Sequence, residues 1–150
     1  VRHGQLMTPV IHIINGPNLN LIGSREPQVY GTDYLLPFLE NLKAEFTSFD
    51  IRIFQSNHEG ELIDYIQKII ADCDGIMINP AAYTHTSVAI RDALRLHSCP
   101  IIEVHLSDPK RREEFRHHSM IRDLVWSHIE GLGVEGYRVA MLRMAELVVR

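Results

Sequence analysis

The chain has 150 residues, of which 45% are hydrophobic and 23% charged, as is typical of a globular protein with one core. Its net charge of −4 argues against nucleic acid or an acidic membrane as the main partner. No segment approaches the length of a membrane span, and the N-terminus lacks the apolar stretch of a signal peptide. We therefore expect a cytoplasmic protein with a single domain over residues 1–150, in which Met7 is a candidate start and residues 1–6 are foreign or disordered.

Strand and helix signals alternate in the first half of the chain. Val10–Ile14 is an apolar run that ends at the turn residues 15–18, which indicates a buried strand followed by a tight turn. Apolar residues then recur at helical spacing over Tyr34–Phe46, with Asp33 as the expected N-cap. The alternating segment Ile51–Phe54 predicts a strand at or near an edge of the sheet.

The same alternation continues in the second half. Apolar residues at helical spacing between Leu62 and Ile70 predict an amphipathic helix whose first turn, just before them, contains Glu59 and Glu61, where negative charge suits the helix dipole. The remaining predicted elements are a strand at Gly75–Ile78, a helix at Thr86–Leu96 capped by Thr84 or Thr86, strands at Ile101–Leu106 and Leu124–Ile129, and a helix at Tyr137–Val149. This order predicts an α/β fold of the flavodoxin-like type, a three-layer sandwich with a five-stranded parallel sheet.

Polar and ionisable residues follow the predicted strands, and open α/β sheets bind ligands beyond the carboxyl ends of their strands. These residues are Asn15, Asn18, Arg25 and Tyr30 after the first strand, Asn79, Tyr83, Thr84 and His85 after the third, and His105, Ser107, Arg111, Arg112 and Arg116 after the fourth. The connections at the opposite edge carry ordinary turn residues, among them Cys73 and Cys99, which we interpret as small core residues. We therefore predict a site at the carboxyl edge, where clustered arginines suit an anionic substrate.

The segment of residues 16–31 is too long for a minimal strand-to-helix connection, which is typical of a functional lid. Within it, Tyr30 is either a base or a packing residue beside Pro27. A nearby guanidinium such as that of Arg25 would stabilise the phenolate and lower the pKa of the tyrosine. Sequence spacing alone leaves both interpretations open.

Two histidines are candidates for the predicted site. His105 ends an apolar strand, so it is either a hydrogen-bonded core residue or a proton donor whose ring is held by Glu103 on the same face. His85 begins a predicted helix, where the dipole disfavours a charged imidazolium, and we expect a neutral ring that binds a hydroxyl group. Ser107 and the amides beside it are candidates for receiving a carboxylate.

Three other signals are not expected to carry chemistry. Residues 131–136 match the dinucleotide pattern GxGxxG, but no strand follows to close the unit, so we interpret them as a turn. The nine histidines include no pair at a recognised metal-ligand spacing with a third ligand. Lys43, Lys68 and Lys110 do not follow strands, which argues against a Schiff base. We therefore expect neither a metal nor a cofactor.

Several blocks of the sequence, in order, resemble the type II 3-dehydroquinate dehydratases. These blocks are Ile14–Leu21, Gly23–Pro27, Tyr30–Gly31, Gln55–Asp64, Asn79–Asp92, Glu103–Ser107 and Arg112–Arg116. The similarity runs from about Val10 to Leu147. Two departures are Ala81, where glycine is common in the family, and Ile22, where leucine is common.

The resemblance implies dehydration of 3-dehydroquinate to 3-dehydroshikimate, in the shikimate pathway of aromatic amino acid biosynthesis, by anti elimination through an enolate. It implies that Tyr30 removes the proton alpha to the ketone with a pKa lowered by Arg25, and that His105 protonates the departing hydroxyl. Asn18 would hold a water beside the enolate oxygen. The other implied roles are carboxylate binding by Asn79, Leu106 and Ser107, hydroxyl binding by His85 and Arg116, and support by Arg112 and Glu103.

The resemblance also implies a homo-oligomer in which trimers assemble into a dodecamer. Asp92 would then reach the active site of an adjacent subunit, whereas the alternative is a surface pair with Arg91 or Arg95. Two rival functions remain: a flavin-binding module, disfavoured because residues 15–18 lack the glycines and hydroxyls of a phosphate loop, and an inactive scaffold. The sequence does not separate a biosynthetic role from a catabolic one.

Overall fold

The structure is a computed structural model that describes residues 8–23 and 34–148. Its sheet has five parallel strands in the order β2-β1-β3-β4-β5. The strands are β1 (Val10–Asn15), β2 (Asp50–Gln55), β3 (Gly75–Asn79), β4 (Ile101–His105) and β5 (Ser127–Glu130). The predicted flavodoxin-like fold is confirmed, and the strand order reverses at β1 and β3, where such sheets place their ligands.

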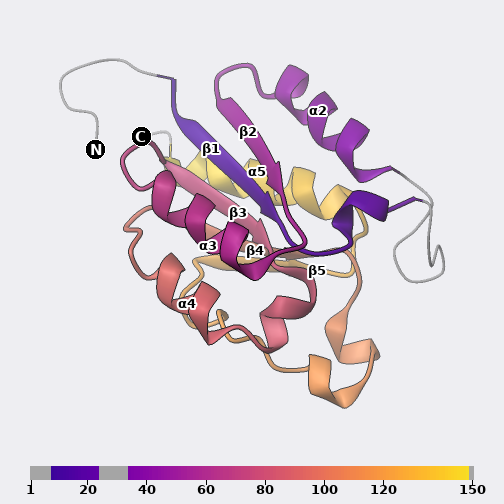
Figure 1. The fold of residues 1–150 in the computed structure, drawn as a ribbon. Helices are drawn as coiled ribbons and strands as arrows, with labels where there is room; N and C mark the ends of the chain where they lie inside the picture. The colour runs from indigo at the N-terminus through magenta and orange to yellow at the C-terminus, as the bar shows by residue number, and fades with distance from the viewer. Residues whose placement is uncertain (1–7, 24–33, 149–150) are drawn as a thin grey trace.

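Helices cover both faces of the sheet (Figure 1). On one face, α2 (Leu35–Glu45) and α5 (Glu135–Val148) pack against β1, β3 and β4 in one hydrophobic cluster. On the other face, α3 (Glu59–Lys68) and α4 (Val88–Leu94) form a second cluster with the opposite side chains of the same strands. The three layers predicted from the alternation of strands and helices are therefore present.

The central and edge strands differ as their sequences indicate. All six residues of β1 are buried, because both of its faces are covered by helices. Ile11 and Ile13 belong to the cluster under α2 and α5, and Ile14 belongs to the cluster under α3 and α4. Arg52 in β2 is exposed, which confirms the prediction that this strand lies at an edge.

The segment before α4 is where the sequence prediction was wrong. Residues Ala81–His85 form a 3-10 helix, η2, and α4 begins only at Val88. Ser87 caps α4, because its Oγ accepts a hydrogen bond from the backbone N–H of Ile90 at 2.9 Å, so neither Thr84 nor Thr86 is the cap. His85 thus ends a 3-10 turn and does not begin the helix.

Smaller differences concern the ends of other elements. Tyr34 takes the N-cap position of α2, and the predicted cap, Asp33, lies outside the described residues. Strand β5 begins at Ser127, three residues later than the sequence indicated. The GxGxxG segment is a turn between β5 and α5, in which Gly131 and Gly133 have positive φ, as the turn interpretation expects. None of the helices within residues 8–23 and 34–148 is long and apolar enough to span a membrane.

Candidate active site

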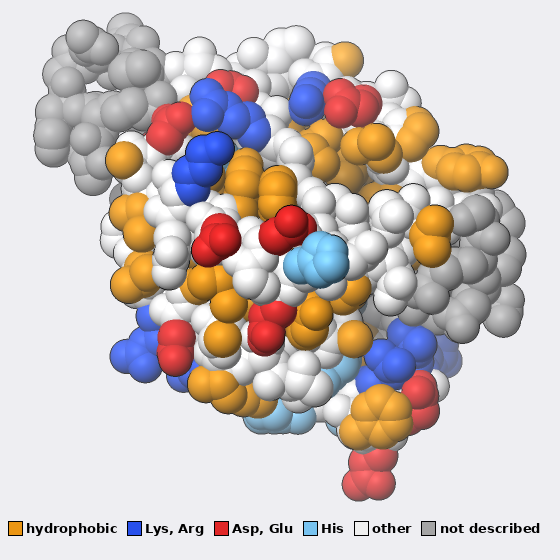
Figure 2. All heavy atoms as spheres, in the orientation of Figure 1, with side chains coloured by type: hydrophobic (Ala, Val, Ile, Leu, Met, Phe, Trp, Pro, Cys, Tyr) orange, Lys and Arg blue, Asp and Glu red, His pale blue; other side chains and the backbone are white. Residues whose placement is uncertain are grey.

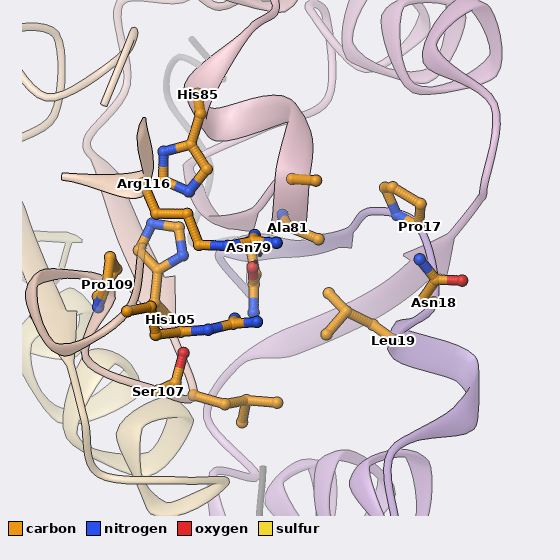
Figure 3. A pocket seen from close by; sticks show the side chains of 13 residues that line it. Pro17, Asn18, Leu19, Asn79, Ala81, His85, His105, Ser107, Pro109 and Arg116 are labelled. Atoms are coloured by element: carbon orange, nitrogen blue, oxygen red, sulfur yellow. Dashed lines mark hydrogen bonds between the residues drawn. The ribbon is translucent and has the colours of Figure 1, made fainter. Parts of the chain in front are cut away.

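The carboxyl ends of β1, β3 and β4 open into a cavity of about 200 Å³. The loops that follow these strands contain three further 3-10 turns, η1 (Leu19–Leu21), η3 (Pro109–Arg111) and η4 (Glu114–Arg116). Figure 3 shows the side chains that line the cavity, which are Pro17, Asn18, Leu19, Asn79, Ala81, Ala82, His85, His105, Leu106, Ser107, Pro109, Arg112 and Arg116. This wall includes two arginines, two histidines and, among the described residues, no acidic side chain, so it favours an anionic ligand.

At the floor of the cavity, a buried network fixes the amide of Asn79. Its Oδ1 accepts a hydrogen bond from the backbone N–H of Ala81 at 3.0 Å, and its Nδ2 donates to the Tyr137 hydroxyl at 3.2 Å. Tyr137 in turn donates to Asn15 Oδ1 at 2.6 Å, and burial raises the pKa of this tyrosine. Since Nδ2 has a second hydrogen, Asn79 retains one donor for a ligand.

Backbone strain is concentrated at the cavity wall. Among the described residues, the only non-glycine residues with positive φ are Asn18 (70°) and Ala81 (56°), and both line the cavity. The left-handed region favours glycine, so Ala81 holds a backbone conformation that is costly for a residue with a side chain. Gly16 holds the two loops together: its N–H donates to the Asn79 carbonyl at 2.8 Å, and an added Cβ would lie 2.3 Å from the Pro80 oxygen.

The loop after β2 supports the loop after β1 from behind. Asn57 Oδ1 accepts a hydrogen bond from the backbone N–H of Asn18 at 2.9 Å and another from Gln55 Nε2 at 3.1 Å. The same Gln55 amide donates to the Gly16 carbonyl at 3.1 Å. These contacts give a structural role to the block around residues 55–57, to which the sequence analysis assigned none.

His105 at the end of β4 is paired with a fully buried carboxylate. Its Nε2 lies 2.7 Å from Glu103 Oε2, and Glu103 also accepts hydrogen bonds from Arg122 Nε at 2.9 Å and from Ser119 Oγ at 2.8 Å. Burial would raise the pKa of Glu103, but these three hydrogen bonds outweigh it and lower the pKa to about 2. Because an ionised carboxylate only accepts, Nε2 of His105 carries a proton, and Nδ1 is left for a ligand.

His85 is positioned to accept a hydrogen bond from a ligand. Its Nδ1 lies 2.8 Å from the His118 carbonyl oxygen, which can only accept, so this nitrogen carries the proton. Burial lowers the pKa of His85, and the neighbouring His105 and Arg116 lower it further. The ring is therefore neutral near pH 7 with Nε2 as an acceptor, as the sequence predicted, although burial and not a helix dipole is the cause.

Arg112 and Arg116 supply the positive charge of the cavity. Glu113 orients both, because its carboxylate lies 3.2 Å from Arg116 Nε and 3.8 Å from Arg112 Nε. Figure 2 shows basic side chains at the lower right, over η3 and η4, with acidic side chains beside them. Two guanidinium groups oriented by one carboxylate leave a net positive charge at the entrance.

Leu106 and Ser107 form the wall directly after β4. Their carbonyl groups accept hydrogen bonds from the backbone N–H groups of Gly133 at 2.9 Å and of Gly131 at 3.1 Å. The glycine-rich turn before α5 therefore holds this segment in place. A pattern that resembles a dinucleotide site serves here to support the cavity wall.

The structure brings together most of the residues that the sequence singled out. Asn18, Asn79, His85, His105, Leu106, Ser107 and Arg116 line the cavity, and Glu103 lies directly behind His105. Arg112, expected to act as a support, lines the cavity itself. Asp92 does not line it and is exposed on α4. Tyr30 and Arg25 lie outside the described residues.

Three residues that hold this site in place were missed from the sequence. Arg122 and Ser119 bind Glu103 from a segment 16 to 19 positions further along the chain, and Tyr137 reaches Asn15 across 122 positions. A tyrosine or arginine at such separations gives no local signal, although burial of Tyr137 on the inner face of α5 was a hint that its hydroxyl needs a partner.

Comparison with known proteins places this geometry in a family. A family model described as dehydroquinase class II matches residues 9–145. The chain is 49% identical over 144 residues to a 3-dehydroquinate dehydratase of Cereibacter sphaeroides, covering 94% of this chain and 97% of that protein. It is 51% identical over 135 residues to a catabolic 3-dehydroquinase 2 of Neosartorya fischeri, covering 89% and 90%.

A solved structure supports the same assignment. The crystal structure of a type II dehydroquinase from Propionibacterium acnes superposes with a TM-score of 0.87 at 38% sequence identity, covering 95% of this chain and 99% of that chain. The residues that the family model matches, 9–145, include the β1, β3 and β4 loops that enclose the cavity. The chain belongs to the class II dehydroquinase family, as its sequence blocks indicated.

Proposed function

We propose that the protein is a hydro-lyase that dehydrates 3-dehydroquinate to 3-dehydroshikimate. The observation that carries this proposal is the cavity in which two arginines face the buried Glu103–His105 pair. A small anionic hydroxy-ketone needs positive charge to bind and a positioned proton donor to lose its hydroxyl group. The names of the relatives support the same reaction.

In the proposed reaction, a base removes the proton alpha to the ketone and an enolate forms. As the enolate collapses, the carbon–oxygen bond of the neighbouring hydroxyl breaks, a carbon–carbon double bond forms, and the oxygen leaves as water with a proton from the enzyme. No electrons are gained or lost overall, so the elimination needs only an acid, a base and a site that stabilises the enolate. We assign the anti stereochemistry on the family resemblance.

His105 is the proposed acid. Protonated on both nitrogens, its ring would donate from Nδ1 to the departing hydroxyl while Nε2 remains bound to Glu103. The ionised Glu103 balances the charge of the imidazolium, and Arg122 and Ser119 keep that carboxylate ionised. After the transfer, His105 is neutral and regains its proton from solvent.

Tyr30 is the proposed base, with Arg25 lowering its pKa, and both come after the cavity residues Pro17 to Leu19 in the sequence. Asn18 would hold the water beside the enolate oxygen. The support for these three roles is the match of residues 14–31 to the family blocks, together with the position of Asn18 in the cavity wall.

The remaining side chains of the cavity are proposed to bind different groups of the substrate. Asn79 and the Leu106–Ser107 segment are proposed to bind the carboxylate, because Asn79 has one amide hydrogen left after binding Tyr137. His85 Nε2 would accept from one ring hydroxyl and Arg116 would donate to another. Arg112 is assigned to anion attraction at the entrance, a more direct role than the support expected from the sequence.

The assembly is a further part of the proposal. Asp92 is exposed on α4 at a distance from the cavity wall, so a role in catalysis requires the site of an adjacent subunit. Its neighbour Arg91 binds Asp123 through two pairs of atoms, and Arg91 Nη2 donates to Asp123 Oδ2 at 2.9 Å. This ion pair disfavours a strong pair between Asp92 and Arg91. We propose trimers that assemble into a dodecamer, in which Asp92→Ala weakens substrate binding or assembly and leaves the subunit folded.

Light scattering together with activity tests the assembly. The wild-type protein is expected to be larger than a trimer at working concentration, and Asp92→Ala to shift towards smaller species or to raise KM. A dilute monomer with full activity would contradict the assembly but would leave the chemistry intact. A cytoplasmic location and a role in aromatic amino acid biosynthesis stay predictions, since one relative is described as catabolic.

The reaction itself is tested by ultraviolet absorbance, because the product is a conjugated enone. Purified protein with 3-dehydroquinate should give a rising absorbance, and borohydride added with substrate should not inactivate it, since no imine forms. A protein that leaves 3-dehydroquinate unchanged would support the inactive-scaffold alternative. A reduced covalent adduct in the mass spectrum would contradict the lysine-independent mechanism.

A further inference from the structure

The amino edge of the sheet contains a cluster that the dehydration does not use. Cys73 precedes β3, and His97 and Cys99 precede β4, the neighbouring strand. The sequence suggested two unrelated core cysteines, but the fold brings the three side chains together, with all ligand atoms within 4.8 Å of one another. They are half-buried, and they lie at the opposite edge of the sheet from His105.

The spacing of these atoms fits a tetrahedral metal ion. Zinc–sulfur bonds of about 2.3 Å and zinc–nitrogen bonds of about 2.0 Å place two sulfur ligands about 3.8 Å apart, and a sulfur and a nitrogen about 3.5 Å apart. In the structure, Cys73 Sγ and Cys99 Sγ are 3.6 Å apart, and Cys99 Sγ and His97 Nδ1 are 3.9 Å apart. Shifts of less than about 1 Å would therefore bring both pairs of atoms to the distances expected around a zinc ion.

The orientation of His97 is that of a metal ligand. Its Nε2 lies 2.8 Å from the carbonyl oxygen of Ile66 in α3, so Nε2 carries the proton and the lone pair of Nδ1 points toward Cys99. Histidines that bind metals almost always donate their other nitrogen in this way, which fixes the ring and its tautomer. A disulfide between the cysteines would need no such histidine.

The charge of the three ligands and their access to solvent both suit a bound cation. Two thiolates and a neutral imidazole around one divalent ion carry no net charge, which suits half-buried ligands. A surface hollow of about 240 Å³ reaches Cys99 and His97, which leaves room for a water as the fourth ligand.

We propose that Cys73, His97 and Cys99 form a binding site for a soft divalent ion of the zinc class, completed by water. Thiolate and imidazole ligands select zinc over magnesium or calcium, which prefer oxygen. The bound ion joins the turn before β3 to the turn before β4, and through His97 it also fixes α3. Its role is to stabilise the amino edge, and the dehydration does not depend on it.

Cobalt binding to the reduced, metal-free protein tests this site directly. One equivalent of Co²⁺ should produce a sulfur-to-cobalt charge-transfer band and tetrahedral visible bands, and Zn²⁺ should remove both. Cys99→Ser should lose the charge-transfer band, or weaken it greatly, and His97→Gln should weaken cobalt binding by tenfold or more. The matched control is His128→Gln, an exposed histidine in β5, which should bind as the wild type does.

Thermal unfolding gives a second readout. Zn²⁺ at about a hundredfold excess over its Kd should raise the Tm of the wild type by roughly 5 to 10 °C and leave Cys73→Ser nearly unchanged. If Cys99→Ser does not fold, Cys73→Ser and His97→Gln provide the same comparison. The proposal is overturned if the wild type gives no sulfur-to-cobalt band, if Cys99→Ser retains it, or if mass spectrometry finds the cysteines joined in a disulfide that Zn²⁺ does not prevent. Loss of the zinc site with full dehydratase activity would leave the proposed function standing.

Discussion

The two edges of the parallel sheet differ in what their polar groups bind. At the amino edge, polar groups bind one another: Arg52 lies 2.8 Å from both Asp50 and Asp72, and the ring of His12 is held by the Tyr65 hydroxyl and the Asp72 carbonyl. At the carboxyl edge, two arginines and two histidines face a cavity instead. Both edges contain histidines beside ionisable groups, so the presence of such residues alone does not locate catalysis.

Backbone strain separates the two edges more clearly. Among the described residues, the non-glycine residues with positive φ are Asn18 and Ala81, which both lie at the carboxyl edge and line the cavity. Left-handed backbone at a residue with a side chain costs on the order of 1 kcal/mol, and it persists where the surrounding structure imposes it. Strained loops and charged side chains that face a cavity therefore mark the carboxyl edge, which is where we propose the dehydration takes place.

The largest effect that sharpens this comparison is expected at Tyr30. Tyr30→Phe keeps the ring but removes the phenolic oxygen, so kcat should fall by at least about a hundredfold while substrate still binds. The control is Tyr34→Phe, which removes a hydroxyl from an exposed tyrosine at the start of α2 and should leave kcat unchanged. Steady-state rates with 3-dehydroquinate measure both. Near-normal turnover of Tyr30→Phe would mean that another group is the base.

A smaller loss of rate is expected when the partner of His105 is neutralised. Glu103→Gln keeps the shape but removes the charge that balances a protonated His105, so kcat should fall by about tenfold or more. Glu130→Gln is the control, because Glu130 also binds Arg122 and, although it pairs with His105 in the register of β4 and β5, it has no described side-chain hydrogen bond to the His105 ring. Equal rates for the two variants would show that Glu103 acts only as a structural partner of Arg122.

The same carboxylate makes a prediction about stability and pH. Folding lowers the pKa of Glu103 from its ordinary 4.5 to about 2, so its ionised form stabilises the fold by roughly 3 kcal/mol. This contribution is fully present above about pH 5 and is lost as the pH falls through the folded value near 2. Urea unfolding should therefore show a smaller loss of stability over this acidic range in Glu103→Gln than in the wild type. Parallel curves for the two proteins would contradict the assignment.

The smallest expected effects come from the strained position at Ala81. Ala81→Gly relieves the left-handed strain but gains freedom in the unfolded chain, so the free energy of unfolding should change by less than about 1 kcal/mol. Ala81→Val places a β-branched residue at the same φ and should lower the free energy of unfolding by more than about 1 kcal/mol. Urea unfolding of both variants measures the difference. A valine variant as stable as the glycine variant would show that the loop relaxes freely.

Sequence periodicity predicted the sheet and its layers because the strands are continuous apolar runs and the helices have one apolar face. It placed the start of α4 at Thr86, two residues too early, because residue type does not reveal the extended backbone of Ser87 that separates the 3-10 turn at Ala81–His85 from α4. Ser87 was passed over as a cap because Thr84 and Thr86, which lie close by, also belong to a residue type that caps helices.

The candidate site was predictable where chemistry follows a strand directly. Asn79 and His105 are the last residues of β3 and β4, Ser107 follows β4 two positions later, and the direction of a parallel sheet brings such residues together. The cluster of Cys73, His97 and Cys99 was not predictable, because its ligands have no recognised spacing and meet only since β3 and β4 are neighbours. Contacts that depend on strand order are invisible until that order is known.

The central claim is that the dehydration takes place at the carboxyl edge with His105 as the acid. It is tested most directly by replacing, one at a time, two histidines on adjacent strands. His105→Gln and His128→Gln each remove one imidazole, but only His105 lines the cavity and binds the buried Glu103. With 3-dehydroquinate at saturation, His105→Gln should lower kcat by at least about a hundredfold with little change in KM, and His128→Gln should match the wild type. A His105→Gln variant that keeps turnover within a few-fold of the wild type would contradict the account.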